Sequence, residues 1–153
     1  MIVVHLSGTL GLADGGVAET AKTIARAKME LSASEAFFRG VLCNVLVCLA
    51  VWLCFAAHTV IGKIFAILFP ISAFVALGFE HSVANMYLIP IGLIAEGGAW
   101  SAANLAGFAR NLVFVTAGNI VGGAVLVALV YWLVYLWRPR GANRGREESG
   151  TAD

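Results

Sequence analysis

The chain has 153 residues, of which 60% are hydrophobic and only 12% are charged, and its mean hydropathy is +0.88. Soluble domains are about 45–50% apolar and about 25% charged, so this composition excludes a disordered chain, a disulfide scaffold and a nucleic-acid-binding protein. We predict an integral membrane protein, because a soluble domain of this size has too much surface to cover with so few polar side chains.

The charged residues lie mainly at the two ends of the sequence, and the formal net charge is only +1. Between residues 40 and 137 the charged residues are only Lys63, Glu80, Glu96 and Arg110. This stretch is therefore apolar enough to lie in a bilayer, and a charge within it points to pairing or to function.

Residues 1–8 resemble the end of an apolar segment, and they lack the basic region and the length of a signal peptide. A Gly-rich turn follows over residues 8–16. Residues 17–35 mix both charge signs with good helix formers, and Ile24 and Lys28 stand at helical spacing. We therefore predict a short interfacial or external helix in this region.

The first predicted span runs from about residue 36 to residue 57. It has the ~20 apolar residues that are needed to cross a hydrocarbon core of about 30 Å. Glu35 and Arg39 stand four residues apart at its beginning, which is a mildly favourable spacing on a helix. His58 and Lys63 mark its other end.

The second apolar region, residues 64–94, is too long for one upright crossing. As a single helix it would measure about 46 Å at about 1.5 Å per residue. Its middle contains a glycine followed by a carboxylate, an imidazole, a hydroxyl and an amide. We predict two half-helices, 64–78 and 83–94, joined by a break at 78–82 that lines a cavity or is buried in protein.

A polar, Gly-rich loop is predicted for residues 95–110, and a last span for the charge-free residues 111–137. Aromatic residues of an interfacial belt gather at the end of this span. They are Tyr131, Trp132, Tyr135 and Trp137.

The tail, residues 138–153, is predicted to be disordered. It begins with Arg138, Arg140, Arg144 and Arg146. Arginines next to a span mark the cytoplasmic side, so counting back places the turn at 58–63 inside and residues 1–35 outside. The predicted fold is an all-α, polytopic membrane protein with three spans, of which the middle one is broken.

The main group of polar residues within the spans is Glu80, His81, Ser82 and Asn85. One interpretation is a polar knot that pins helices together. The other is a site on a permeation path, because the charge of His81 can switch near neutral pH. A half-helix starting at Ser82, with Ser82 as its cap, would also direct backbone N–H groups at a small anion.

Other positions within the spans also have two interpretations. Asn44 and Asn119 are either hydrogen-bonding links between helices or part of the polar path. Phe74, one helical turn before the break, is either a packing residue or an apolar constriction that gates by size and dewetting. Gly118 and Gly122 form a G-x-x-x-G motif, which permits close helix approach.

The sequence contains no pattern that indicates catalysis, a metal site or a cofactor. Cys43, Cys48 and Cys54 all lie in the first span and are expected to pack there. A membrane haem site would need two facing histidines, and only His81 lies at mid-depth. We find no nucleophile elbow, phosphate loop or catalytic carboxylate pair, and therefore predict that the chain is not an enzyme.

Three segments in collinear order resemble the formate/nitrite transporter family and cover residues 36–137. FFRGVLCNVLVCLAVW at residues 37–52 resembles one family signature, and GFEHSVANMYLIPIG at residues 78–92 resembles the other. GNIVGGAVLVALVYWLVY at residues 118–135 resembles the last helix of the family. The resemblance implies an aquaporin-like fold and a homopentamer in the inner or plasma membrane, with a pore through each protomer.

Members of this family pass small monovalent anions, so the resemblance implies formate- or nitrite-like anions and protons as ligands. The pore histidine of the family falls on His81, beside the glutamate at Glu80. The imidazole is expected either to raise the local positive potential or to donate a proton, so that the anion crosses as its neutral acid. The remaining family positions fall on Asn44, Asn85 and Asn119 for the asparagines, Phe74 for the constriction and Val47 for its apolar partner.

Two features depart from the family. Its members are usually close to twice this length, with six spans in two inverted repeats. The chain therefore corresponds to the second repeat, and residues 1–8 to the end of the third span. Phe114 stands where proline is common in the family, at the entry to the last helix.

The alternative to an active transporter is a truncated or split half with no transport of its own.

Overall fold

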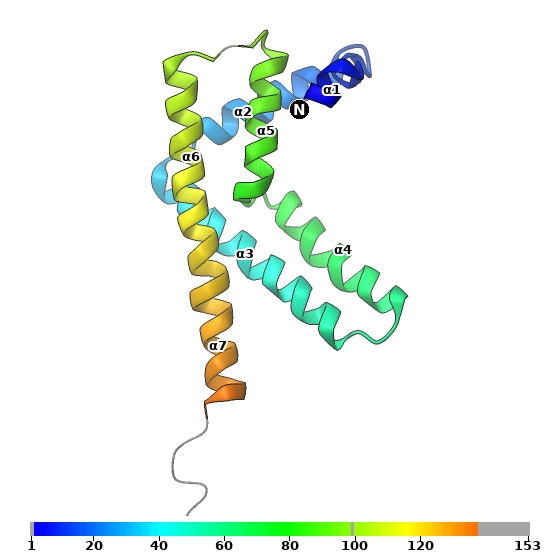
Figure 1. Cartoon of the computed structure of the whole chain (residues 1–153), viewed down its shortest axis with the longest axis vertical. Helices are drawn as coiled ribbons and strands as arrows, with labels where there is room; N and C mark the ends of the chain where they lie inside the picture. The colour runs from blue at the N-terminus through cyan, green and yellow to red at the C-terminus, as the bar shows by residue number, and fades with distance from the viewer. Residues whose placement is uncertain (1, 99, 138–153) are drawn as a thin grey trace, which may run out of the picture.

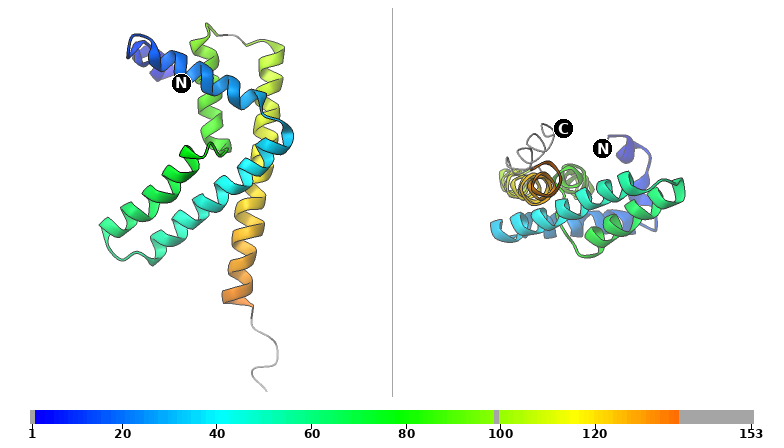
Figure 2. Two further views of the ribbon diagram at one scale, coloured as in Figure 1. Left: turned by 180° about the vertical axis from the view of Figure 1, so that it is seen from behind. Right: turned by 90° about the horizontal axis from the view of Figure 1, so that it is seen from below.

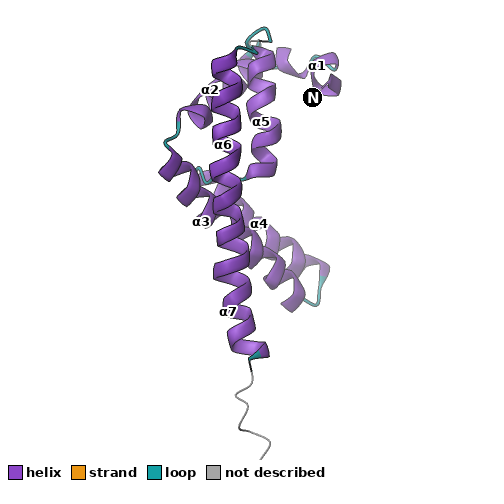
Figure 3. Cartoon of the chain, turned by 60° about the vertical axis from the view of Figure 1, so that its left-hand side comes forward, coloured by secondary structure: helices purple, strands orange, loops and turns teal. Residues whose placement is uncertain are grey.

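The computed structural model describes residues 2–98 and 100–137, and every regular element in these residues is helical (Figures 1 and 3). The elements are α1 (Ile2–Leu6), the 3-10 turn η1 (Thr9–Gly11), α2 (Gly16–Glu30), α3 (Ala33–Ala56), α4 (Val60–Ala76), α5 (Ser82–Ala95) and α6 (Ala102–Ile120), which continues through the π-helical η2 (Val121–Ala128), α7 (Leu129–Tyr131) and the π-helical η3 (Trp132–Leu136). The predicted all-α class is confirmed. The tail predicted for residues 138–153 lies outside the described residues.

Two helices in the described part of the chain are long and apolar enough to cross a membrane. They are α3, with 24 residues, and the continuous helix Ala102–Leu136, with 35 residues. Only 22% of the most apolar window of each is buried within the chain, so most of both surfaces faces outward. Helices α4 and α5 are apolar but shorter, with 17 and 14 residues.

Helix α3 begins with a capping box, slightly earlier than the predicted start at residue 36. The Ser32 hydroxyl accepts a hydrogen bond from the Glu35 backbone N–H at 3.3 Å. The Glu35 carboxylate in turn accepts one from the Ser32 backbone N–H at 3.0 Å. This reciprocal pairing satisfies N–H groups that a helix N-terminus otherwise leaves without partners.

Helix α6 starts at Ala102, well before residue 111, where the last span was predicted to start. The prediction of a loop over residues 95–110 is therefore wrong for its second half. Ser101 caps the helix by accepting a hydrogen bond from the Asn104 backbone N–H at 3.2 Å. The residues that follow are rich in alanine, which has the highest helix propensity, and this outweighs the polar side chains that favoured a loop.

Helices α3 and α6 cross where glycines let their backbones approach closely. A Cβ on Gly118 would collide with the carbonyl of Phe37, and one on Gly122 with the carbonyl of Val41. From the other side, a Cβ on Gly40 would lie 2.8 Å from a backbone carbonyl oxygen of α6. The G-x-x-x-G motif therefore lies at this crossing, and the two helices diverge beyond it (Figure 1).

Helix α2 packs against α5 in a similar way. A Cβ on Gly92 of α5 would lie 2.5 Å from the carbonyl oxygen of Ala21, and Ala25 is fully buried at this contact. Arg26 and Glu96 form an ion pair between the same two helices. This packing fixes α2 where the side chain of Lys28 reaches the beginning of α5.

The interruption predicted at 78–82 lies between the end of α4 and the beginning of α5. Gly78 adopts a φ of +66°, a left-handed conformation that glycine adopts without steric cost. Before this point α4 runs back beside α3, and after it α5 lies beside the first half of α6 (Figure 2). The break therefore lies next to the crossing of α3 and α6.

Candidate functional site

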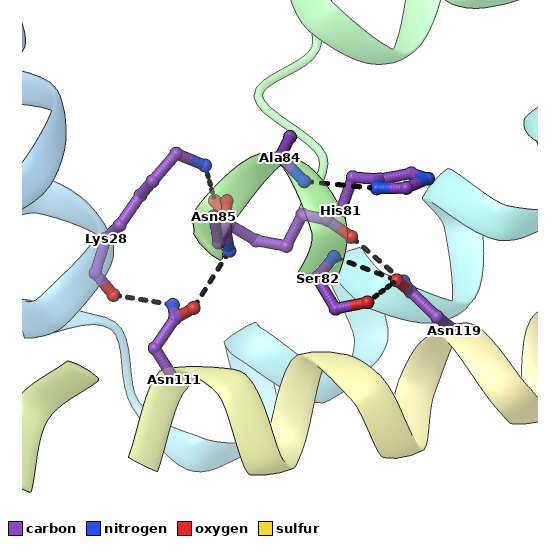
Figure 4. A network of polar contacts seen from close by, with 8 residues as sticks. Lys28, His81, Ser82, Ala84, Asn85, Asn111 and Asn119 are labelled. Atoms are coloured by element: carbon purple, nitrogen blue, oxygen red, sulfur yellow. Dashed lines mark hydrogen bonds and ion pairs between the residues drawn. The ribbon is translucent and has the colours of Figure 1, made fainter. Parts of the chain in front are cut away.

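Glu80 is the buried charge at the centre of the break. Its carboxylate has two partners, Lys28 and Asn85, which are labelled in Figure 4. The Lys28 ammonium donates to one of its oxygens at 2.8 Å, and the Asn85 amide donates to the other at 2.6 Å. The side chain of Lys28 is itself largely buried, with 15% of its surface exposed. A carboxylate in such surroundings is stable only when it is paired in this way.

Asn111 of α6 closes this chain of contacts. Its carbonyl accepts a hydrogen bond from the Asn85 amide at 2.8 Å, and its own amide donates to the backbone carbonyl of Lys28 at 2.8 Å. One ion pair and three hydrogen bonds therefore join α2, the beginning of α5 and α6. The Asn85 side-chain oxygen is buried and has no partner among the described residues.

Sequence reasoning missed both Lys28 and Asn111 as members of this group. Lys28 was noted only for its helical spacing, and it lies 52 positions before Glu80. The signal that could have found it is the requirement of a buried carboxylate for a cation. The cation-bearing segment 17–35 was a natural source of one, but the sequence does not show which of its cations comes close.

Asn119 of α6 holds the backbone of the break from the other side. Its amide nitrogen donates to the carbonyls of Gly40 and Glu80 at 2.8 and 3.0 Å. Its side-chain oxygen accepts from both the backbone N–H and the hydroxyl of Ser82 at 3.0 Å. Asn44 of α3 donates to the backbone carbonyl of Asn119 at 2.5 Å. Both asparagines predicted as links or path residues therefore make contacts between helices.

His81, and not Ser82, caps α5, so the prediction of Ser82 as the cap is wrong. His81 has an extended backbone, and its Nδ1 accepts a hydrogen bond from the Ala84 N–H at 3.4 Å. The hydroxyl of Ser82 instead donates to Asn119. A nitrogen that accepts a hydrogen bond carries no proton, so the neutral imidazole bears its proton on Nε2.

The ring of His81 lies against the ring of Phe74, with centroids 6.1 Å apart and an interplanar angle of 27°. His81 is half-buried, whereas Glu80, Ser82 and Asn119 around it are buried. Val47, predicted as the apolar partner of Phe74, is half-buried on α3. Phe74 and His81 are thus brought together, on the side of the break where the imidazole keeps some exposure.

Side chains occupy part of the first turn of N–H groups of α5. Those of Ser82 and Ala84 already donate to Asn119 and His81. The positive end of the helix dipole nevertheless lies beside the imidazole and favours negative charge there. Among the described residues, no cluster of three or more His, Cys, Asp or Glu side chains is placed to hold a metal ion.

Comparison with known proteins identifies the family. The family model for formate/nitrite transporters matches residues 1–133. The chain belongs to the formate/nitrite transporter family. This confirms the resemblance of the three sequence segments, and it places the chain among membrane channels and transporters rather than enzymes.

Among curated members of the family, a probable formate transporter of Methanothermobacter thermautotrophicus is 51% identical over 132 residues, which cover 85% of this chain and 47% of the relative. The formate channel FocA of Escherichia coli (strain K12) is 37% identical over 151 residues, which cover 89% of this chain and 53% of the relative. The chain thus spans about half the length of these family members.

A solved structure described as a pentameric formate channel with formate bound superimposes on this chain with a TM-score of 0.73. The two are 34% identical, and the match covers 88% of this chain and 59% of the other. A second structure, an FNT family ion channel, matches with a TM-score of 0.63 at 41% identity. The helical arrangement described above is therefore similar to that of family channels.

Proposed function

We propose that this chain transports small monovalent anions of the formate and nitrite class across the membrane. The observation that carries the proposal is the position of His81. It caps α5 at a helix break within an apolar region, keeps part of its ring exposed and lies against Phe74. The known channels and transporters to which the chain is similar give the substrate class.

In this mechanism the imidazole couples anion passage to protonation. In the neutral ring Nε2 carries the proton and Nδ1 accepts the Ala84 N–H, so a second proton binds at Nδ1 and displaces this hydrogen bond, whose length is 3.4 Å. A protonated ring raises the local positive potential or passes its proton to the anion, which then crosses as the neutral acid. Phe74, with Val47 as its apolar partner, forms the constriction that excludes larger or hydrated solutes.

The polar network holds the break that presents His81. Asn119 binds the backbone on both sides of the imidazole, and Asn44 binds the backbone of Asn119. Asn85 binds the carboxylate of Glu80, whose charge is balanced by Lys28. A network of this kind keeps irregular backbone stable at bilayer depth, where water is not available to satisfy it.

We further propose an aquaporin-like half with three crossings. Helix α3 and the helix Ala102–Leu136 each cross alone, and α4 and α5 cross together as two half-helices because each is shorter than the ~20 residues a crossing needs. The arginines after Trp137 support a cytoplasmic C-terminus, with the protein in the inner or plasma membrane. The pentameric channel to which the chain is similar supports a pentamer.

A second proposal is a half-transporter that conducts only together with a separate first half. It is favoured by the length of the chain, which is about half that of its relatives. Uptake of formate and nitrite by liposomes separates the two proposals. Flux from the chain alone as external pH falls supports an independent pore, and flux only after a first repeat is added supports the half-transporter. No flux in either preparation contradicts both.

A further inference from the structure

A cavity lined by charged side chains lies where α2 crosses α5 and reaches the beginning of α6 (Figure 2). Its volume is about 530 Å³. Arg26 and Glu30 of α2, Glu96 after α5 and Arg110 of α6 bring four charges to its wall. In the membrane placement proposed above, residues 1–35 and 95–110 are external, so the cavity meets solution rather than lipid.

This cavity is separate from the polar break. Arg26 and Glu30 stand four residues apart on α2 and share one face of the helix. Lys28 lies two residues from each of them and therefore points to another side, where its ammonium donates to Glu80. The charges of the cavity are thus not part of the group that holds His81.

Two of the four charges in the cavity neutralise each other, and the other two do not. Arg26 forms an ion pair with Glu96. The Arg110 guanidinium donates from Nη2 to the backbone carbonyls of Met29 and Leu31 at the end of α2, at 2.7 and 3.0 Å. Neither Arg110 nor Glu30 forms an ion pair with any of the described residues, so one cation and one anion face the cavity unpaired.

Arg110 is suited to receive a carboxylate. Its two bonds to backbone carbonyls fix the plane of the guanidinium, while its Nε and Nη1 have no acceptor among the described residues. A guanidinium that is held in place loses little further freedom when a carboxylate binds to its remaining N–H groups. The Glu30 carboxylate offers the matching partner for an ammonium group.

The balance of charge selects the kind of ligand. A simple anion would be attracted by Arg110 but repelled by Glu30, and a simple cation would meet the reverse. A small molecule that carries one group of each sign satisfies both residues. We propose that this cavity binds a zwitterion of the α-amino acid class, with its carboxylate on Arg110 and its ammonium on Glu30. The site bridges α2 and α6 and acts independently of anion conduction.

Equilibrium dialysis of radiolabelled probes against the full chain in detergent micelles tests this proposal. The probes are L-alanine, propionate and ethylamine, which share a small apolar body and carry both charges, only the negative charge or only the positive charge. Glu30→Gln is the main variant, because Glu30 has no described partner that its loss would leave unpaired. Asp14→Asn is the matched control, an exposed carboxylate before α2 that does not line the cavity.

We expect the unmodified chain to bind alanine about tenfold or more tightly than propionate or ethylamine, because only alanine makes both charged contacts. Glu30→Gln should lower the affinity for alanine by about tenfold and leave that for propionate unchanged or higher. Asp14→Asn should alter neither affinity. Arg110→Gln, with its helix content checked by circular dichroism, should lose binding of both alanine and propionate.

Three results would overturn the proposal. Absence of alanine binding to the folded, unmodified chain would show that the cavity is no amino acid site. Equal affinity for alanine and propionate would show a site for anions in general. An affinity for alanine that is the same in Glu30→Gln and in Asp14→Asn would remove Glu30 from the site. None of these measurements depends on whether the chain conducts formate or nitrite.

Discussion

Glu80 and Lys28 are two charges removed from water at the same place, and each depends on the other. Attraction between buried charges rarely exceeds the cost of desolvating them, so such a pair is weak evidence for extra stability. Removing one of the two charges is nevertheless costly, because the other charge is then buried without a partner. The buried Glu80 therefore requires α2 to stay packed against α5, because only this packing brings Lys28 to the break.

Glu80→Gln is expected to lower the free energy of unfolding by about 3–5 kcal/mol, because Lys28 is left buried and unpaired. The double variant Lys28→Met, Glu80→Gln should recover much of this loss. Denaturant titration in detergent micelles measures both. The matched control is Glu96→Gln, whose partner Arg26 has 65% of its side chain exposed and which should cost at most about 1 kcal/mol. A loss no larger than that of the control contradicts the ion-pair role.

At this scale the sequence showed which residues were unusual but not how they pair. Glu80, Asn85 and Asn119 could be singled out because polar groups are rare at bilayer depth. Their partners could not, because Lys28 and Asn111 come from other segments and their positions depend on how the helices pack. The exchange of roles between His81 and Ser82 followed from backbone conformation, which residue type alone does not determine.

Helix α3 and the last helix owe their crossing to glycines, and this crossing positions the break. Gly40, Gly118 and Gly122 bring the two backbones into contact, and Asn119 lies at the same level and binds across it. Side-chain hydrogen bonds of this kind need the backbones to be close. The polar network therefore depends on the close packing of the two helices.

Gly118→Ala and Gly122→Ala are each expected to destabilise the protein by about 1–3 kcal/mol, because the added methyl meets a backbone carbonyl and forces the helices apart. This should hold although alanine is the better helix former. Unfolding in micelles measures the loss. Gly11→Ala is the control, since a Cβ at that position meets nothing within 4 Å. Equal stability of all three variants contradicts the close approach.

Element boundaries were predictable where local chemistry marks them. The break after α4 was visible because a glycine precedes a cluster of polar residues in an apolar run. The beginning of α6 was missed because polar residues in 102–110 favoured a loop, while Ser101 supplies a cap and the alanines favour helix. The continuation of α6 as the π-helical turns of η2 had no signal that we recognised in the sequence.

The described residues bury little of their apolar surface, as expected for a protein that meets lipid or further protein on most sides. Both long helices have 22% of their most apolar window buried. The chain also covers only about half of its relatives. The family and the all-α class were predictable from three sequence segments, whereas the assembly around His81 depends on surfaces that lie beyond one copy of this chain.

Co-expression with a first-repeat chain is expected to give an assembly with five copies of each, by analogy with the pentameric channel that this chain resembles. Native mass spectrometry in detergent measures the stoichiometry. The chain expressed alone is the comparison. A single pair of halves, with no larger ring at any protein concentration, contradicts the pentamer.

The pH profile of formate flux tests the role of His81 most directly. Vesicles contain the chain with its first repeat, and the unmodified chain is compared with His81→Asn and with a control, His58→Asn, at an exposed position before α4. We expect flux to rise as pH falls in the unmodified chain and in the control, and to lose this dependence in His81→Asn. The same pH profile for all three would contradict the assignment of His81 as the group that couples protonation to anion passage.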